Sequence, residues 1–173
     1  ARAIGTHGTP STNLNRIRET GLSSSEPLTY WRMSKRDILR ILKRDGKRGL
    51  FDAIHNVVAS NLLYPHQRIP SVQVFLADYG VVVARAPSGR LEGAFGKPEL
   101  FREGLWGFPA KDVLSTLNLS DDEMRAIALK HLNGNVYAPI PNTINEWGSP
   151  RAIEIRKDVA RIFTEKIIGM MTE

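Results

Sequence analysis

The chain has 173 residues, of which 42% are hydrophobic and 24% charged, which is enough apolar material for one domain with a core. Its 24 Lys and Arg residues outnumber its 18 Asp and Glu residues, so the net charge is +6 and an anionic partner is favoured. The lack of cysteine excludes disulfides, thiolate nucleophiles and cysteine-based zinc sites.

Residues 1–29 contain many Gly, Ser, Thr, Asn and Pro residues. Apolar periodicity is brief there and is confined to the surroundings of Leu14 and Ile17. This composition is typical of loops and linkers. We therefore expect residues 1–29 to form a flexible arm or linker, and residues 30–173 to form a single globular domain.

The next segment is strongly basic, because eight of the 24 Lys and Arg residues lie between Arg32 and Arg48. Ser34, with Asp37 three residues later, predicts the start of a helix, and Gly46 predicts its end. One face of this helix carries cations at i, i+4, i+7 and i+11, namely Arg36, Arg40, Lys43 and Lys47. The opposite face carries residues that we expect to pack into a core, namely Ile38, Leu39, Ile41 and Leu42.

A second helix is predicted from about Leu50 to Leu63, with Pro65 ending it. Its apolar positions keep helical spacing, namely Leu50, Phe51, Ile54, Val57, Val58 and Leu62. Together the two helices would form a helical hairpin or a helix-turn-helix. In a DNA-reading helix-turn-helix the second helix carries the base contacts. Here the first helix is the basic one, so it is better suited to phosphates than to base edges.

From Ile69 the apolar pattern changes to that of strands. Residues 71–80, 81–85 and 89–96 are predicted to form a small three-stranded antiparallel meander. Its turns would fall at Tyr79-Gly80 and at Pro87-Ser88-Gly89. A helix is then predicted from Glu99 to Trp106, broken at Gly107-Phe108-Pro109.

Two further helices are predicted in the last third of the chain. Ser120 and Glu123 form a capping box for a helix that runs to about Asn133, where Gly134 ends it. Residues 134–148 read as loop, and Ser149-Pro150 begins a long helix with the apolar stripe Ile153, Val159, Ile162, Phe163, Ile167 and Met170. The fold class is therefore α+β and mainly helical, with a helical hairpin, a small three-stranded antiparallel meander and a long C-terminal helix.

The cation cluster is the candidate binding surface. The predicted nucleic-acid-binding residues are Arg36, Arg40, Lys43, Arg44, Lys47 and Arg48, with Arg32 and Lys35 at the margin. The alternative is an ordinary solvated face of a basic protein. Tyr30 and Trp31 adjoin the cluster, where they would either stack on bases or pack into the core.

No catalytic motif accompanies the cluster. The four histidines, His7, His55, His66 and His131, lack metal-ligand spacing, and we expect no metal or cofactor. His66 or His131 would act as a general base only with a paired acid, which no motif supplies, and a capping or surface role is the alternative. The acids Asp121-Asp122-Glu123 in a first helical turn are explained by the helix dipole.

One group of segments resembles a known family. Glu-Gly-Leu-Trp-Gly-Phe-Pro (103–109) is followed by a Leu-Ser-Asp helix start (119–121) and by Leu-Asn-Gly-Asn-Val-Tyr-Ala-Pro (132–139). This arrangement resembles the closing motifs of DNA cytosine-5 methyltransferases, in which a Gly-Phe-Pro segment ends the target-recognition region. The resemblance implies that Gly107, Phe108 and Pro109 match that segment, and that Gly134, Asn135 and Pro139 match one near the cofactor pocket. The catalytic Pro-Cys pair and the glycine-rich S-adenosylmethionine site are missing, so the chain cannot methylate cytosine by that route alone.

These patterns are compatible with three functions. The leading hypothesis is a non-catalytic domain that binds DNA or RNA, either by itself or as a recognition part of a larger enzyme. The alternative is a structural or assembly protein, such as a nucleocapsid-type or complex subunit, that docks on a protein partner or on itself through its N-terminal arm and C-terminal helix. A third is a small enzyme acting on nucleic acid through His66 or His131. Because no signal peptide or membrane-length apolar run is present, we expect an intracellular protein, cytoplasmic or at the nucleoid or nucleus, without a membrane partner.

Overall fold

The computed structural model describes residues 4–24, 28–29, 31–33, 35–62, 76–85, 95–96, 99–102, 105–131, 133–134 and 150–171. The described helices are α1 (Leu14–Thr20), α2 (Lys35–Asn61), α4 (Asp121–His131) and α6 (Pro150–Met171), with short 3-10 turns η1 (Ser11–Asn13) and η2 (Ala110–Asp112). The strands are β1 (Ile4–Pro10), β2 (Leu22–Ser24), β3 (Leu28–Thr29), β4 (Trp31–Met33), β5 (Tyr79–Arg85), β6 (Phe95–Gly96), β7 (Glu99–Arg102), β8 (Leu105–Phe108) and β9 (Val113–Asn118).

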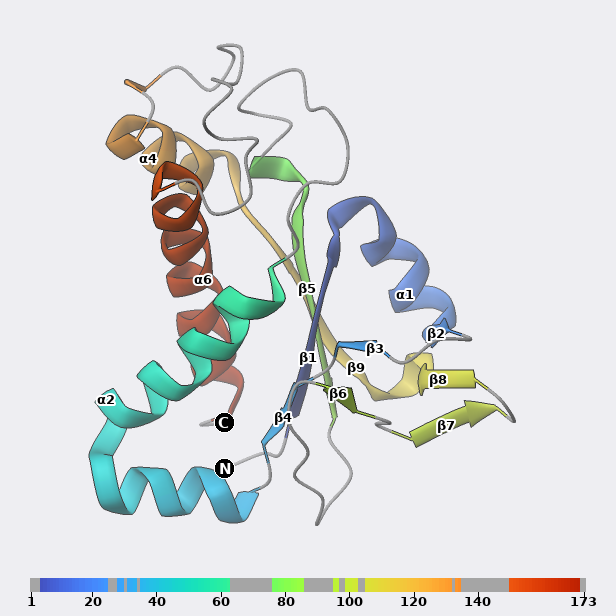
Figure 1. Cartoon of the computed structure of the whole chain (residues 1–173). Coiled ribbons are helices and arrows are strands. Elements are labelled where there is room, and N and C mark those ends of the chain that lie inside the picture. Colours follow the sequence, from blue (N-terminus) through green and yellow to red (C-terminus); the bar gives the residue numbers. More distant parts are fainter. Residues whose placement is uncertain are drawn as a thin grey trace.

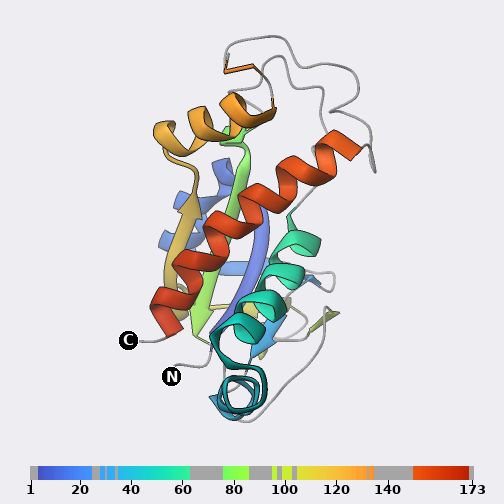
Figure 2. The same ribbon diagram turned by 90° about the vertical axis from the view of Figure 1, so that its left-hand side faces the viewer.

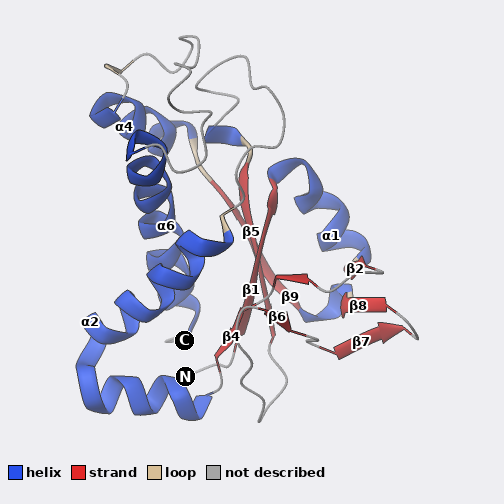
Figure 3. Cartoon of the chain, in the orientation of Figure 1, coloured by secondary structure: helices blue, strands red, loops and turns tan. Residues whose placement is uncertain are grey.

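A four-stranded antiparallel sheet in the order β4-β1-β5-β9 forms the centre of the fold. Helices α2, α4 and α6 cover one face of this sheet, and α1 with the three-stranded sheet β2-β8-β7 lies on the other side (Figure 1). Figure 2 shows α6 crossing the first face between α4 and the second part of α2. The expected α+β class and the long C-terminal helix are confirmed, and Figure 3 shows how helices and strands separate into layers.

Strand β5 is buried on both of its faces. Val81 and Val83 belong to the core beneath the helices α2, α4 and α6, whereas Val82 and Ala84 belong to the core beneath α1. Successive residues of a strand point to opposite faces of a sheet. A strand covered on both sides is therefore apolar at nearly every position, which explains why this segment shows no alternation.

The predicted meander over residues 71–96 is wrong in its location. The chain does not turn at Tyr79-Gly80, because both residues lie within β5 and pair with β1. Gly80 is required for a different reason: a Cβ there would stand 2.8 Å from the carbonyl oxygen of Thr9. A three-stranded antiparallel sheet does exist, but β2, β8 and β7 form it, so the helix predicted over Glu99–Trp106 is instead a pair of strands. The turn expected at 87–89 lies outside the described residues.

The expectation of a flexible N-terminal arm is also wrong for residues 4–24. Strand β1 lies between β4 and β5 in the central sheet, and Ile4 is fully buried. Its small residues allow close packing between two covered faces, and Thr6 and Thr9 are buried as well. This strand is held by backbone pairing with β5, from Ile4 opposite Arg85 to Pro10 opposite Tyr79. Composition alone does not reveal such pairing.

Helix α2 consists of two segments separated by Gly46, which has φ 69° and ψ −167°. The first segment (residues 35–45) and the second segment (residues 47–61) run in different directions, and the first is seen end-on in Figure 2. The sequence predicts this pair of helices joined at a glycine. The second helix starts at Lys47, earlier than the predicted Leu50, and Ser34 lies outside the described residues.

Helices α4 and α6 follow the sequence closely. Ser120 N–H donates to Glu123 Oε1 at 2.9 Å, and Glu123 N–H donates to Ser120 Oγ at 3.1 Å, so the predicted capping box is present. Gly134 has φ 83° and its N–H donates to the Ala128 carbonyl, which ends α4. In α6 most of the predicted stripe is inside the core, with Val159, Phe163 and Ile167 fully buried, whereas Ile153 and Met170 are partly buried. No helix within the described ranges is long and apolar enough to cross a membrane.

Candidate nucleic-acid interface

Seven of the eight predicted cations lie on α2, and all seven are exposed. We define them as the basic surface: Lys35, Arg36, Arg40, Lys43, Arg44, Lys47 and Arg48. The eighth, Arg32, lies in strand β4 opposite Gly5, so it is not on the helix. Within these fourteen helical positions only two acids, Asp37 and Asp45, accompany the seven cations. The surface is therefore strongly positive.

Three of these cations have acidic neighbours on the same helix. Arg40 Nη2 lies 2.9 Å from Asp37 Oδ1, Arg44 Nε lies 2.8 Å from Asp45 Oδ2, and Arg48 Nε lies 3.4 Å from Asp52 Oδ1. The three arginine side chains are 66–87% exposed, and such exposed pairs contribute only about 0–1 kcal/mol. A phosphate therefore competes readily with each carboxylate. In the described part of the chain no carboxylate lies within 4 Å of the basic groups of Lys35, Arg36, Lys43 or Lys47.

The apolar face of the first segment is narrower than the sequence predicts. Ile38 is buried, and Ile41 and Leu42 pack partly against the core, as expected. Leu39, however, is 50% exposed, so its predicted burial is wrong. It lies four residues from Lys35 and from Lys43, and side chains at that spacing share a helix face. The exposed leucine therefore stands among the cations.

Gly46 also divides the predicted line of cations. Helical spacing relates Arg36, Arg40 and Lys43, but it does not extend across a residue with non-helical backbone angles. Lys47 therefore does not continue the first segment's face, and this part of the prediction is wrong. Instead Lys47 and Arg48 start the second segment, which packs against α6.

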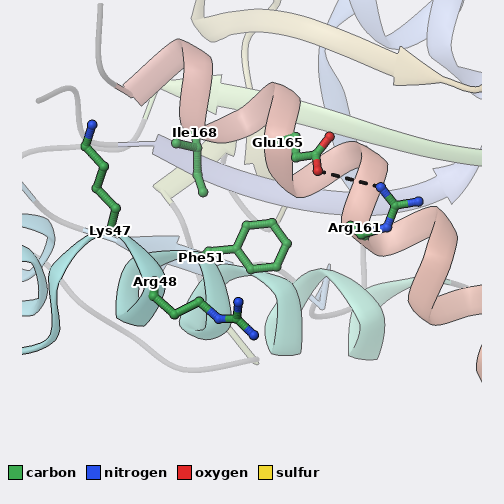
Figure 4. Close-up of a pocket in the computed structure, with 6 residues that line it drawn as sticks. All are labelled: Lys47, Arg48, Phe51, Arg161, Glu165 and Ile168. Atoms are coloured by element: carbon green, nitrogen blue, oxygen red, sulfur yellow. Dashed lines mark ion pairs between the residues drawn. The ribbon is translucent and has the colours of Figure 1, made fainter.

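A groove of about 680 Å³ lies between the second segment and α6 (Figure 4). We define the α2–α6 groove by its lining residues: Lys47, Arg48, Phe51, Arg161, Glu165 and Ile168. Arg161 Nη1 lies 3.6 Å from Glu165 Oε1. Sequence reasoning missed the three α6 residues, whose i, i+4 ion pair looks like that of any exposed helix. Only the packing of α6 on α2 brings them beside the basic surface.

The structure supplies an acid for His131. Its Nε2 is hydrogen-bonded to the Asp158 carboxylate, and Lys130 Nζ lies 3.0 Å from the same oxygen. Burial by itself would raise the pKa of Asp158, but the hydrogen bonds from His131 and Lys130 and their charges hold that pKa below its usual value of 3.8. The His131 and Asp158 side chains are 13% and 12% exposed. This contact joins the end of α4 to α6.

His55 makes different contacts. His55 Nε2 is 3.0 Å from the Lys157 carbonyl oxygen, and its ring stacks on Phe51 with centroids 5.6 Å apart. His7 lies in β1, and His66 lies outside the described residues. Among the residues that the structure describes, no three potential ligands are grouped to hold a metal ion.

Of the residues matched to methyltransferase motifs, the structure describes Gly107, Phe108, Pro109 and Gly134. Gly107 and Phe108 pair with β2, and Phe108 is buried in the core beneath α1. Gly134 follows α4, whose buried residues belong to the core on the other face of the sheet. Asn135 and Pro139 lie outside the described residues. Comparison with protein-family models, with curated proteins and with solved structures found no significant match.

Proposed function

We propose that this chain is a nucleic-acid-binding domain whose basic surface contacts phosphates. The observation that carries the proposal is the concentration of seven exposed cations and two acids in fourteen residues of α2. Each cation that replaces condensed counterions on a nucleic acid adds to the affinity through counterion release. Four of the seven have no carboxylate within 4 Å among the described residues, so they bind phosphate without breaking an ion pair.

The form of α2 favours phosphates over base edges. The first segment presents Arg and Lys at helical spacing, with the carboxylates of Asp37 and Asp45 held beside two of the arginines. Arginine and lysine contacts to phosphate position a protein on a duplex without reading its sequence. Binding to DNA or RNA with little sequence preference is therefore the expected behaviour. An intracellular location, in the cytoplasm or at the nucleoid or nucleus, accompanies this proposal.

The test is a salt titration of labelled duplex DNA with wild type and with the variant R36A/R40A/K43A. If Arg36, Arg40, Lys43 and one further cation neutralise phosphates, log K falls with log salt at a slope of about −3.6, and loss of those three should reduce the slope to about −0.9. The control R16A/K111A/R125A removes the same charge from exposed residues on α1, η2 and α4. The proposal would be overturned if both variants lost the same affinity for DNA, or if the affinity of the wild type did not depend on salt.

The narrower version, a recognition part of a larger methyltransferase-like enzyme, rests on the sequence resemblance alone. It predicts that the chain binds duplexes of different base sequence with different affinities. The assembly alternative relied on an exposed arm and an exposed C-terminal stripe. Strand β1 lies inside the central sheet, and most of the α6 stripe is buried in this chain's own core, so this alternative has less support than nucleic-acid binding.

A further inference from the structure

The α2–α6 groove has a polar end, an apolar middle and a second polar end. In Figure 4, Lys47, Arg48 and Ile168 lie toward one end, Phe51 lies in the middle, and Arg161 and Glu165 lie toward the other. The two helices run antiparallel here, since His55 contacts Lys157 while Lys47 shares the groove with Ile168. The order of chemical groups along the groove is therefore set by both helices.

The apolar side chains of the groove are partly exposed. Phe51 and Ile168 are half-buried, whereas Leu50, Ile54 and Ile167 beside them are fully buried in the core. Phe51 is also held in place, because the His55 ring stacks on it with an interplanar angle of 17°. His55 is in turn fixed by its contact with the Lys157 carbonyl. The groove thus offers a positioned aromatic ring as a contact surface.

The two polar ends differ in charge. Lys47 and Arg48 present two cations, with Asp52 only loosely paired to Arg48 at 3.4 Å. The other end combines Arg161, a donor, with Glu165, an acceptor, in a loose 3.6 Å pair. A phosphate matches the first end, and the edge of a nucleobase, which carries both donors and acceptors, matches the second. Lys47 and Arg48 belong to both the basic surface and the groove, so the two binding regions share these cations.

We infer that the α2–α6 groove holds an unpaired base of a single-stranded nucleic acid, with its phosphate at Lys47 and Arg48. The base packs on Phe51 and Ile168 and presents its edge to Arg161 and Glu165. This inference rests on the proposed function, since the basic surface and the groove share these two cations. Base stacking on an aromatic side chain makes single-strand binding tolerant of sequence. The chain therefore binds single-stranded nucleic acid more tightly than duplex with the same number of phosphates.

The experiment compares wild type and Phe51→Leu for binding to a labelled single-stranded oligonucleotide, to its duplex and to an abasic strand of equal length. Loss of the ring should weaken single-strand binding about tenfold, and leave duplex and abasic-strand binding within about twofold. Phe51→Tyr keeps the ring and should bind like wild type. Arg161→Ala changes a half-exposed side chain at the other end of the groove, and it should likewise weaken binding to the single strand only. This variant provides the test if Phe51→Leu does not fold.

The outcomes separate this inference from the proposed function. If Phe51→Leu weakened binding to all three probes equally, or did not weaken binding to the single strand, the groove would not be a base site. The salt dependence of binding by the basic surface would persist in either case, so the proposed function would stand. Absence of binding to every probe at low salt would instead overturn the proposed function itself. Binding of an acidic peptide in the groove, with no discrimination between the single strand and the abasic strand, would likewise count against the base site.

Discussion

The bend in α2 depends on one residue, and its replacement gives a sharp prediction. Gly46 has φ 69° and ψ −167°, a combination that is essentially restricted to glycine. A Cβ placed on Gly46 would meet no atom within 4 Å, so no steric clash contributes and the cost of Gly46→Ala is purely conformational. Holding a non-glycine residue in such a region costs about 1–3 kcal/mol.

The chain has one other response to Gly46→Ala, which is to straighten α2 into a continuous helix. Alanine would then gain about 1 kcal/mol of helix propensity over glycine. The first segment would have to leave its place, however, and Ile38 is 1% exposed. Exposing a fully buried isoleucine costs about 1.5–3 kcal/mol, which exceeds the gain. Both responses are therefore destabilising, and the less costly of them sets an expected net loss of roughly 0.5–2 kcal/mol.

Urea unfolding followed by tryptophan fluorescence or circular dichroism measures this loss. The matched control is Gly169→Ala, because Gly169 lies inside α6, has ordinary helical φ and likewise has no atom within 4 Å of an added Cβ. That variant should gain up to about 1 kcal/mol, since alanine is the better helix former. If Gly46→Ala were as stable as wild type, or gained stability as Gly169→Ala does, the bend would not be a requirement of the fold.

Two further predictions concern the contacts between α4 and α6. Because the pKa of Asp158 is lowered in the folded chain, its carboxylate stabilises the fold above about pH 4, and that contribution is lost as the pH falls through the folded-state pKa. Asp158→Asn should therefore be less stable than wild type at pH 7, with a difference that shrinks as the pH falls below about 4 in urea titrations; a constant difference would contradict this account. Ser120→Ala removes one bond of the capping box and should cost about 1 kcal/mol, a fall of roughly 2–4 °C in Tm. An unchanged Tm would show that the cap contributes nothing to stability.

Local signals account for the parts of the fold that the sequence predicts correctly. The capping box at Ser120 and Glu123 and the glycine at Gly46 act over three or four residues. The stripe of α6 repeats at helical spacing, and most of it is buried as that spacing predicts. The exposure of the basic surface follows the same logic, since charged side chains seldom lose their hydration. Each of these features depends on residues that are close together in the chain.

The tertiary structure alone decides the centre of the sheet and the composition of the groove. Strand β1 gains its place by pairing with β5, which lies far along the chain, and neither composition nor period records that pairing. Burial on both faces removes the alternation from β5, and the turn predicted at Tyr79-Gly80 falls inside this strand. The partnership of His131 with Asp158, and that of Lys47 and Arg48 with Arg161 and Glu165, arises because α6 packs against α4 and α2. The sequence by itself determined the basic segment and the helices α2, α4 and α6, because the signals for them are local, but it wrongly predicted residues 99–106 as a helix where the structure has two strands. The groove required the fold, because distant helices must pack before their side chains can meet.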